Sequence, residues 1–284
     1  MSRIAYVAGQ YLPHRQAAVH IEDRGYQFGD GVYEVIAVMG GHLVDEERHL
    51  ARLNRSLTEL RINPPMNDSA LKIVIREVIR RNGVNTGIVY LQVTRGVAPR
   101  EHAFPKVAKP VLVVTSRRSR PPDPRLGQEG IAVITIPDIR WQRCDIKSIA
   151  LVANVLGKQQ AREAGAYEAW QVDREGQVTE GTSTNAWIVT ADDNVITRAA
   201  DHAILNGVTR AAILEIIQRE GYRLVERPFT VAEARAAREA FLTSTTADLL
   251  PVARIDGIPV ADGRPGPLSR KLREAYFLHA AAAA

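Results

Sequence analysis

Residues 143–148 have the sequence RCDIKS, and residues 149–157 continue as the apolar run IALVANVLG. Burial disfavours the ammonium form of a lysine and leaves a neutral amine that can attack a carbonyl. Lys147 is therefore a candidate for imine (Schiff-base) chemistry. An isolated lysine at the start of an amphipathic helix more often keeps its charged end in water. The possible partners of Lys147 elsewhere in the chain must decide between these two interpretations.

The composition limits the class of protein. At 284 residues, the chain exceeds the common size of one domain, which favours two. Its single cysteine, Cys144, excludes an internal disulfide framework or a multi-cysteine metal site and suits a reducing compartment. The first residues lack a signal peptide's apolar region, and no apolar run is long enough to span a bilayer. We expect a cytoplasmic protein with no membrane partner and no metal.

The net charge of +5, from 37 basic and 32 acidic residues, leaves open a nucleic-acid-binding or other interaction protein. Arginines cluster at positions 76, 80 and 81 and again at 117, 118 and 120. Neither cluster is interleaved with aromatic residues, so solvated faces are the better interpretation. We expect no nucleic-acid partner.

The first half of the chain mixes short strands with two helices. Residues 4–7, 32–39, 42–44, 88–94 and 111–115 have the pattern of strands, and Gly40-Gly41 predicts a hairpin. Residues 22–31 contain three glycines and predict a tight loop. The spacing of Leu50, Leu53, Leu57 and Leu60 predicts a helix from Asp45, and a second helix should begin at Asn67 or Ser69 and end at Asn82-Gly83. The connection 95–105 is long enough to carry function.

A proline-rich stretch, SRPPDPR at 119–125, predicts a domain boundary. We expect an N-terminal α+β domain at 1–118, a linker at 119–126 and a C-terminal domain at 127–284. In the second half, strands are predicted at 131–136 and 168–172, and helices at 150–164, 209–220 and 268–279. Asp256-Gly257 predicts another hairpin. The interpretation is an α+β protein of two domains with a cleft between them.

Three further segments carry candidate chemistry. Glu180, in VTEGTSTN (178–185), is a lone carboxylate among small hydroxyl residues; buried, it would need a partner such as a protonated ring nitrogen. LNGVTR (205–210) opens a helix with a glycine and a threonine, a pattern suited to an anion. LTSTTAD (242–248) supplies adjacent hydroxyls that suit phosphate. Each segment taken alone could equally be an ordinary turn or helix start.

A lysine, a carboxylate and hydroxyl-rich loops together match the needs of pyridoxal 5'-phosphate. With these motifs the chain resembles the class IV, or fold-type IV, pyridoxal-phosphate aminotransferases, and among them the D-amino acid aminotransferases. The resemblance extends from EDRGYQFGDGVYEV (22–35) to STTADLLPV (244–252). It implies a smaller N-terminal α/β sandwich domain and a larger C-terminal pseudo-barrel α+β domain, with the cofactor in the cleft.

The resemblance also assigns roles. Lys147 resembles the Schiff-base lysine, and Glu180 the carboxylate at the pyridine nitrogen. The resemblance implies phosphate contacts at Arg52, Val208, Thr209 and Thr245. Leu205 resembles the residue that packs against the cofactor ring. Tyr33, with Arg100 and His102 in APREHAFP, resembles the group that binds the substrate α-carboxylate.

The reaction implied by the resemblance is transamination between a D-amino acid and a 2-oxo acid, such as 2-oxoglutarate or pyruvate. A homodimer is implied as well, with Arg100 and His102 completing the partner subunit's site. A branched-chain aminotransferase, an aminodeoxychorismate lyase and an (R)-amine transaminase remain alternatives, because they would use the same Lys147 and Glu180. The Arg-x-His arrangement favours the D-amino acid enzymes.

Overall fold

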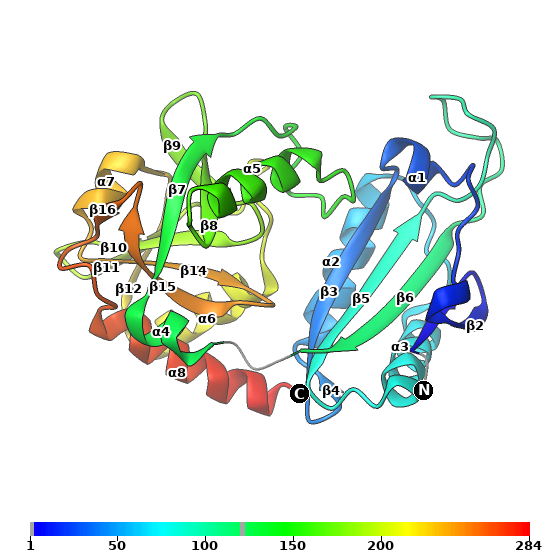
Figure 1. The fold of residues 1–284 in the computed structure, drawn as a ribbon, viewed down its shortest axis with the longest axis horizontal. Helices are drawn as coiled ribbons and strands as arrows, with labels where there is room; N and C mark the ends of the chain where they lie inside the picture. Colours follow the sequence, from blue (N-terminus) through cyan, green and yellow to red (C-terminus); the bar gives the residue numbers. More distant parts are fainter. Residues whose placement is uncertain (1–2, 120–122) are drawn as a thin grey trace. The chain divides into compact units, whose positions relative to one another are not determined.

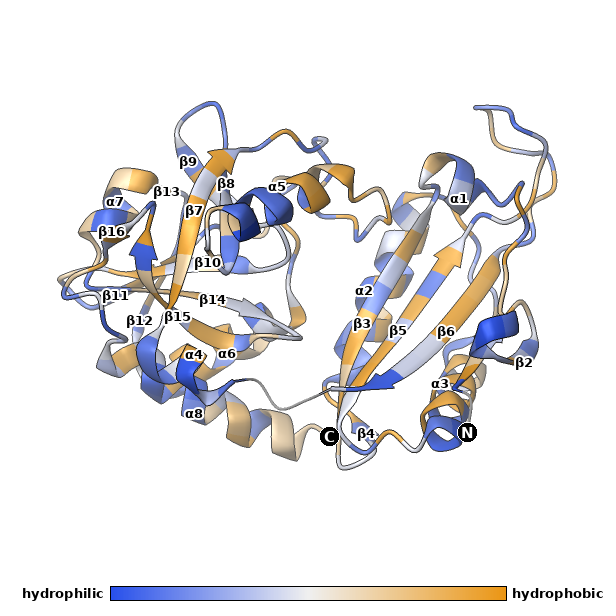
Figure 2. Ribbon diagram, viewed as in Figure 1, coloured by the Kyte–Doolittle hydropathy of each residue, from blue (hydrophilic) through white to orange (hydrophobic). Residues whose placement is uncertain are grey.

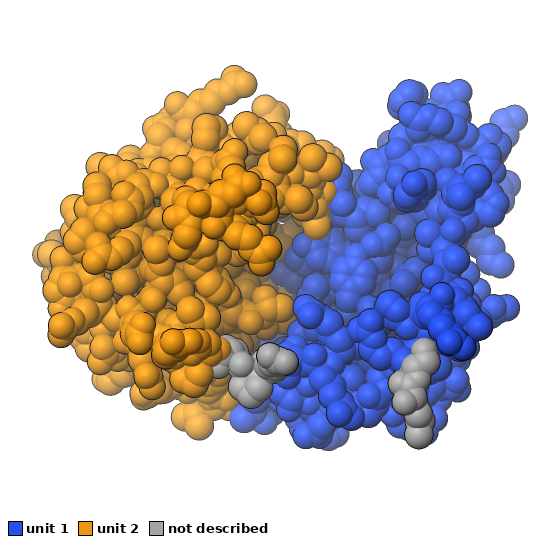
Figure 3. Space-filling view, in the orientation of Figure 1, with its two compact units in different colours: residues 1–120, 146–150, 280–284 blue, residues 121–145, 151–279 orange. Residues whose placement is uncertain are grey.

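The computed structural model describes residues 3–119 and 123–284, which form two compact units (Figure 3). Unit 1 comprises residues 1–120, 146–150 and 280–284, and unit 2 comprises residues 121–145 and 151–279. Two short segments, 146–150 and 280–284, therefore belong with the N-terminal unit although they lie far along the chain. The predicted domains 1–118 and 127–284 contain no such returns, and that division stays a prediction.

Unit 1 is built on a six-stranded sheet with the order β2-β1-β6-β5-β3-β4, and all its strand pairs are antiparallel (Figure 1). Its strands are β1 (Ile4–Val7), β2 (Gln10–Pro13), β3 (Gly31–Met39), β4 (His42–Leu43), β5 (Gly87–Thr94) and β6 (Val111–Arg118). Its helices are the 3-10 turn η1 (His14–Gln16), α1 (Arg24–Phe28), α2 (Glu46–Glu59) and α3 (Asp68–Asn82). Helices α2 and α3 cover one face of the sheet, which gives the expected α/β sandwich.

The core of unit 1 follows from the two periodicities in its sequence. Alternate residues of β3 and β5 are buried, and Leu50, Leu53 and Leu57 of α2 are almost completely buried. Figure 2 shows apolar residues along β3, β5 and β6. The side chain of Asn67 accepts from the N–H of Ala70 and so caps α3, as predicted.

Unit 2 contains a ten-stranded mixed sheet with the order β12-β11-β10-β14-β15-β7-β8-β9-β13, and β16 pairs with β15. Its strands are β7 (Ile131–Pro137), β8 (Glu168–Val172), β9 (Gln177–Gly181), β10 (Asn185–Val189), β11 (Asn194–Thr197), β12 (Arg223–Glu226), β13 (Phe229–Thr230), β14 (Glu239–Ser244), β15 (Asp248–Ile255) and β16 (Ile258–Pro259). Strands β9 and β10 are separated by four others in this order, yet they lie against each other, and the N–H of Gly181 donates to the carbonyl of Thr184. The sheet therefore closes partly on itself, in agreement with the expected pseudo-barrel.

The helices associated with unit 2 are α4 (Pro124–Glu129), α5 (Val152–Glu163), α6 (Val208–Arg219), α7 (Val231–Ala236) and α8 (Pro267–Ala282), whose last residues belong to unit 1. The core contains the stacked rings of Trp187 and Phe241, whose centroids are 5.3 Å apart. The predicted hairpin at Asp256-Gly257 is present, because Ile255 pairs with Ile258. The α+β prediction is therefore confirmed.

Three local predictions need correction. The glycine-rich segment 22–31 contains the short helix α1, which Asp23 caps by accepting from the N–H of Gly25. The helix expected from residue 150 begins at Val152, because the preceding residues 147–149 pair with β3. Residues 124–126 of the predicted linker open α4, with Pro124 in its first turn, where a proline is tolerated. Positions 120–122 of that linker lie outside the described residues.

In the described ranges, we find no helix with the length and apolar character that crossing a membrane requires.

Replacing Leu53 with Ala should lower the free energy of unfolding by about 2–5 kcal/mol, because a fully buried side chain is lost from the α2 face. The matched control is Ile73→Ala, since Ile73 on α3 is 66% exposed and its loss should cost less than about 1 kcal/mol. Urea unfolding followed by circular dichroism measures both values. Equal losses for the two variants would contradict the assignment of the core face.

Candidate active site

Lys147 lies at the edge of the unit 1 sheet, where residues 147–149 pair with the free edge of β3. The N–H of Tyr33 donates to the carbonyl of Lys147 at 3.0 Å, and the N–H of Ile149 donates to the carbonyl of Gly31 at 3.1 Å. On the other side, the N–H of Lys147 donates to the Ser56 hydroxyl of α2 at 3.3 Å. The preceding residue, Ile146, is buried in the core of unit 1. The backbone of Lys147 is therefore held by β3, by Ser56 and by the packing of Ile146.

The side chain of Lys147 lies against Tyr33. Its Nζ is 4.3 Å from the centroid of the Tyr33 ring, close enough for a cation–π contact. Tyr33 in turn stacks on Tyr90 of β5, with ring centroids 5.8 Å apart. Both tyrosines occupy the positions of β3 and β5 that alternate with the buried, helix-facing ones. Thus two predicted site residues, Lys147 and Tyr33, are brought together on one face of the sheet.

Arg52 is held by a carboxylate that the sequence analysis did not identify. Glu34 is fully buried, and it accepts from Nε and Nη2 of Arg52 at 2.8 Å each and contacts Nδ1 of His49 at 2.7 Å. Burial opposes the ionisation of Glu34, but the charge and hydrogen bonds of Arg52 and the contact with His49 together lower its pKa to about 2. Burial lowers the pKa of His49 although its contact with Glu34 acts to raise it, and the charge of Arg52 adds to the lowering. The guanidinium of Arg52 is therefore fixed beside an ionised carboxylate.

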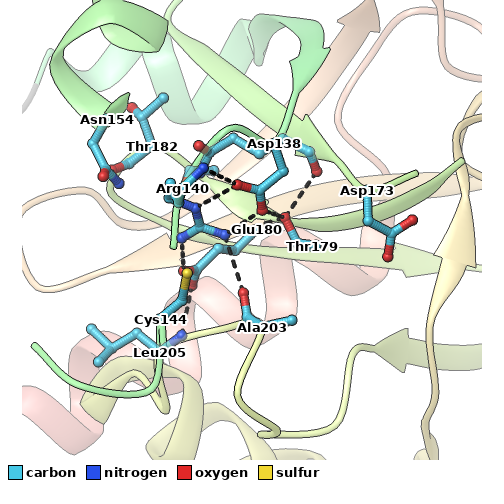
Figure 4. A network of polar contacts seen from close by, with 12 residues as sticks. Asp138, Arg140, Cys144, Asn154, Asp173, Thr179, Glu180, Thr182, Ala203 and Leu205 are labelled. Carbon is cyan, nitrogen blue, oxygen red and sulfur yellow. Dashed lines mark hydrogen bonds and ion pairs between the residues drawn. The ribbon is translucent and has the colours of Figure 1, made fainter. Parts of the chain in front are cut away.

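Glu180 lies near the end of β9 in unit 2 and accepts several hydrogen bonds (Figure 4). Arg140 donates from Nη1 to Oε1 of Glu180. Asn185 Nδ2 and the backbone N–H of Leu205 donate to Oε2, at 3.0 and 3.1 Å. Charge-assisted hydrogen bonds of this kind compensate a buried carboxylate for its lost contact with water.

Arg140 is the second functional residue that the sequence analysis missed. Its guanidinium also contacts Asp138 through Nη2 at 2.7 Å and the carbonyl of Ala203 at 3.1 Å (Figure 4). Burial would raise the pKa of Asp138, but the hydrogen bond and charge of Arg140 bring it below the ordinary value. Burial alone would lower the pKa of Arg140, whereas Glu180 and Asp138 raise it. One arginine therefore neutralises two carboxylates that are largely shielded from solvent.

The first turn of α6 lies beside the Glu180 network. Asn185 Nδ2 also donates to the carbonyl of Leu205 at 2.9 Å, and a Cβ on Gly207 would come within 2.2 Å of Asn185 Oδ1, so a larger residue would displace the Asn185 side chain. Gly207 precedes α6 without a side-chain cap. The first amide groups of the helix, at Val208 and Thr209, therefore lack a capping side chain and suit an anion.

The remaining predicted residues of unit 2 lie near this turn in the fold. The hydroxyl of Thr209 is buried, 3.4 Å from that of Tyr276. Thr245 is half-buried in the turn between β14 and β15. Since Thr243 pairs with Asn185, that turn lies at the same end of β14 as the Glu180 network. Glu180, Leu205, Val208, Thr209 and Thr245 thus gather at one end of the unit 2 sheet.

Arg100 and His102 are exposed on the connection between β5 and β6. Their side chains contact Phe28 of α1: Cζ of Arg100 is 4.7 Å from the ring centroid, and the His102 ring centroid is 5.5 Å away. The three residues predicted to bind the substrate carboxylate therefore lie in two places: Tyr33 is beside Lys147, and Arg100 and His102 are beside α1.

One sequence signal could have revealed Glu34, because a carboxylate inside the apolar strand GVYEVIAVM predicts a buried ion pair. No comparable signal marks Arg140, which lies 40 residues from Glu180 and on an irregular segment. In the part of the chain that the structure describes, no cluster of three or more His, Cys, Asp or Glu side chains could bind a metal.

Comparisons with known proteins agree with one another about the family. The profile of the family described as Amino-transferase class IV matches residues 31–255. The chain is 42% identical over 268 residues to a D-alanine aminotransferase of Bacillus licheniformis, covering 94% of this chain and 93% of that protein. It is 40% identical over 272 residues to the D-alanine aminotransferase of Staphylococcus haemolyticus, covering 95% of each.

Solved structures share the fold. The branched-chain amino acid aminotransferase of Escherichia coli superposes with a TM-score of 0.90 at 22% identity, over 98% of this chain and 94% of that one. The branched-chain aminotransferase of the thermophilic archaeon Thermoproteus uzoniensis, solved with norvaline, superposes with a TM-score of 0.86 at 24% identity, over 98% and 94%.

Replacing Glu34 with Gln should lower the free energy of unfolding at pH 7 by roughly 3 kcal/mol, because Arg52 loses its buried partner. The folded pKa of Glu34, about 2, lies below its ordinary value of 4.5. Its stabilisation is therefore complete above pH 4.5 and is lost as the pH falls through 4.5 toward 2. Urea unfolding from pH 7 to pH 3.5 should show the difference between wild type and Glu34→Gln narrowing with acid. The exposed Glu47→Gln is the control, and a constant difference for Glu34→Gln would contradict the ionised pair.

Proposed function

The chain belongs to the class IV amino-transferase family, and from this premise we propose that it transfers the amino group between a D-amino acid and a 2-oxo acid, using pyridoxal 5'-phosphate. The similarity to D-alanine aminotransferases over nearly the whole chain supports the substrate class. The observation that carries the proposal is the placement of Lys147, whose amine lies against Tyr33 at a position set by backbone pairing.

The residues of unit 2 fit the cofactor. The uncapped first turn of α6 offers backbone N–H groups to a phosphate, with the hydroxyls of Thr209 and Thr245 as further donors. From unit 1, Arg52 is proposed as a further phosphate contact, and Glu34 fixes its guanidinium. Leu205 would pack against the ring. When bound, pyridoxal phosphate supplies an electron sink for the negative charge that develops on the substrate α-carbon.

Lys147 would hold the cofactor covalently between turnovers and then, once released, act on the substrate. Its Nζ would accept the α-proton of the D-amino acid and, in the second half-reaction, would donate a proton to the α-carbon derived from the 2-oxo acid, which makes Lys147 the general base and the general acid. Tyr33 would keep the Nζ on one side of the substrate. Because only one face is served by this amine, the geometry favours one enantiomer.

Glu180 would hold a proton at the ring nitrogen. Its two oxygens already accept from Arg140, Asn185 and the amide of Leu205, so the carboxylate remains charged and oriented. A carboxylate fixed in this way stabilises a nearby positive charge at no cost in reorganisation. Arg140 would therefore act indirectly, because it orients the Glu180 carboxylate that would contact the ring nitrogen.

The substrate α-carboxylate would bind to Arg100, His102 and Tyr33, with the two loop residues contributed by a partner subunit in a homodimer. Six exposed apolar side chains on this part of unit 1 support a dimer contact: Val19, Ile21, Tyr26, Val97, Phe104 and Val107. Asp23 bridges to Val97 and so joins the segment that carries Val19, Ile21 and Tyr26 to the start of the β5–β6 connection, along which Phe104 and Val107 follow. An exposed apolar surface beside a charged loop is typical of a protein interface.

The purified enzyme should convert D-alanine and 2-oxoglutarate to pyruvate and D-glutamate, with much slower turnover of L-alanine and L-leucine. Lys147→Ala should reduce the turnover rate by a factor of roughly 10² or more, because the proton carrier is lost. Cofactor absorbance should still show binding, since the phosphate contacts remain. Chiral chromatography and a coupled pyruvate assay measure these results.

The control is Lys158→Ala, which removes a lysine of α5 placed near Tyr167. Near-normal turnover by Lys147→Ala would contradict its role. Faster turnover of L-leucine than of D-alanine would instead favour the branched-chain alternative.

Arg100→Ala should weaken the use of D-alanine by about 2 kcal/mol in transition-state binding, roughly 30-fold in kcat/KM, because a charge-assisted contact is lost. Steady-state kinetics measure the loss, and cofactor absorbance should be unchanged. Mixing Lys147→Ala subunits with Arg100→Ala subunits should restore activity in heterodimers that carry one intact composite site. If subunit exchange is demonstrated and activity does not return, the site is not shared between subunits.

A further inference from the structure

Arg24 holds the backbone of the loop that carries Arg100 and His102. The side chain of Arg24 is buried, with 3% exposure, in the short helix α1. Its Nη1 donates to the carbonyls of Glu101 and Ala103 at 2.5 and 3.4 Å, and its Nη2 donates to the carbonyl of His102 at 3.3 Å. One guanidinium thus binds three consecutive peptide carbonyls.

The other edge of the Arg24 guanidinium is fixed by Asp30. Nε of Arg24 donates to Oδ2 of Asp30 at 2.8 Å, and Arg95 donates to both oxygens of the same carboxylate at 2.7 and 3.0 Å. Arg95 also donates to the carbonyls of Leu60 and Arg61, at the end of α2. Burial opposes the ionisation of Asp30, but the two arginines lower its pKa below the ordinary value. Arg24 therefore rests on a charged support inside unit 1.

Phe28, one helical turn from Arg24, supplies an apolar surface for the same loop. The guanidinium carbons of Arg24 and Arg100 lie 4.8 and 4.7 Å from the centre of its ring, and the His102 ring is tilted against it. Figure 1 shows α1 at the same end of the unit 1 sheet as the β5–β6 connection. The side chains of Arg100 and His102, which are the proposed substrate contacts of the loop, therefore both lie against the Phe28 ring.

The helix that presents Arg24 and Phe28 is itself rigidly attached. Asp23 accepts from the N–H of Gly25 at 2.8 Å and from the hydroxyl of Thr94 at 2.9 Å. A Cβ at Gly25 would come within 2.2 Å of the Thr94 methyl group, so α1 lies directly on the end of β5. Between β5 and β6, residues 98–110 contain no helix or strand in the described structure. The geometry of residues 100–103 is thus set largely by α1.

We propose that Arg24, assisted by Phe28, is a positioning residue that fixes the loop 100–103 so that Arg100 and His102 can bind the substrate α-carboxylate. The inference rests on the proposed function of that loop. An exposed loop samples many conformations, whereas bidentate recognition of a carboxylate requires one. Arg24 touches neither substrate nor cofactor in this proposal and acts through the loop backbone.

Two variants test the proposal in the cofactor-loaded enzyme. Arg24→Lys keeps a positive charge beside Asp30 but cannot span three carbonyls with a planar fork. Phe28→Leu removes the ring contacts with Arg24, Arg100 and His102 but keeps the ion pair between Arg24 and Asp30. The control is Arg81→Ala, which removes an arginine of α3 that lies over Tyr11 and pairs with Glu77, remote from the loop in sequence.

Hydrogen exchange measured by mass spectrometry should show faster exchange of the amides at 101–104 in both test variants and not in the control. The KM for D-alanine should rise about tenfold while kcat changes less than about threefold, since binding of the carboxylate is lost and the proton transfer is not. Cofactor absorbance should match the wild type. A merely structural role would lower stability without this division between KM and kcat.

Unchanged exchange at 101–104 in both variants would overturn the anchoring of the loop by α1. Faster exchange with a KM equal to that of Arg81→Ala would overturn the positioning role. A wild-type enzyme inactive on D-alanine would overturn the proposed function and with it the substrate role of Arg24, while the exchange result would still decide whether Arg24 anchors the loop.

Discussion

The backbone pairing of residues 147–149 with the edge of β3 is the interaction on which the arrangement of the candidate site depends. It takes a segment that lies between two stretches of unit 2 in the chain and makes it part of unit 1, with Ile146 in the core of that unit. Backbone hydrogen bonds fix the register of this segment against β3, so the Cα of Lys147 has a defined position and its side chain lies beside Tyr33. A reactive amine carried by a flexible loop would lack this definition.

Each unit also contains a buried carboxylate that is held by an arginine. In unit 1 the pair is Glu34 and Arg52, and in unit 2 it is Glu180 and Arg140. In the first pair, Arg52 is the proposed cofactor contact and Glu34 orients it. In the second pair, Glu180 is the proposed cofactor contact and Arg140 orients it. Arginine suits both uses because its planar fork fixes direction as well as charge. The cost of burying these charges is offset by dense hydrogen bonding, which also orients the charges before any ligand binds.

Much of the fold could be predicted from sequence because it rests on local signals. The leucine spacing of α2, the Asn67 cap of α3 and the Asp256-Gly257 hairpin each depend on residues close in the chain. Helix α1 could not be predicted, since five residues are too few to show a period. The choice of Lys147 and Glu180 came from combining distant motifs through a family resemblance. Their supports, Arg140 and the edge of β3, depend on contacts between distant residues, which periodicity does not encode.

The way the chain alternates between the units has a consequence for dissecting the protein. The path enters unit 2 after residue 120, returns for 146–150, leaves again and ends in unit 1, where the N–H of Asp45 donates to the carbonyl of Ala283. A gene fragment that stopped at residue 118 would encode a sheet whose β3 edge is uncovered and whose core lacks Ile146. Bare strand edges recruit other chains, so such a fragment would tend to self-associate. The two units therefore have separate cores, but a cut at the proline-rich connection would not yield an independently complete unit 1.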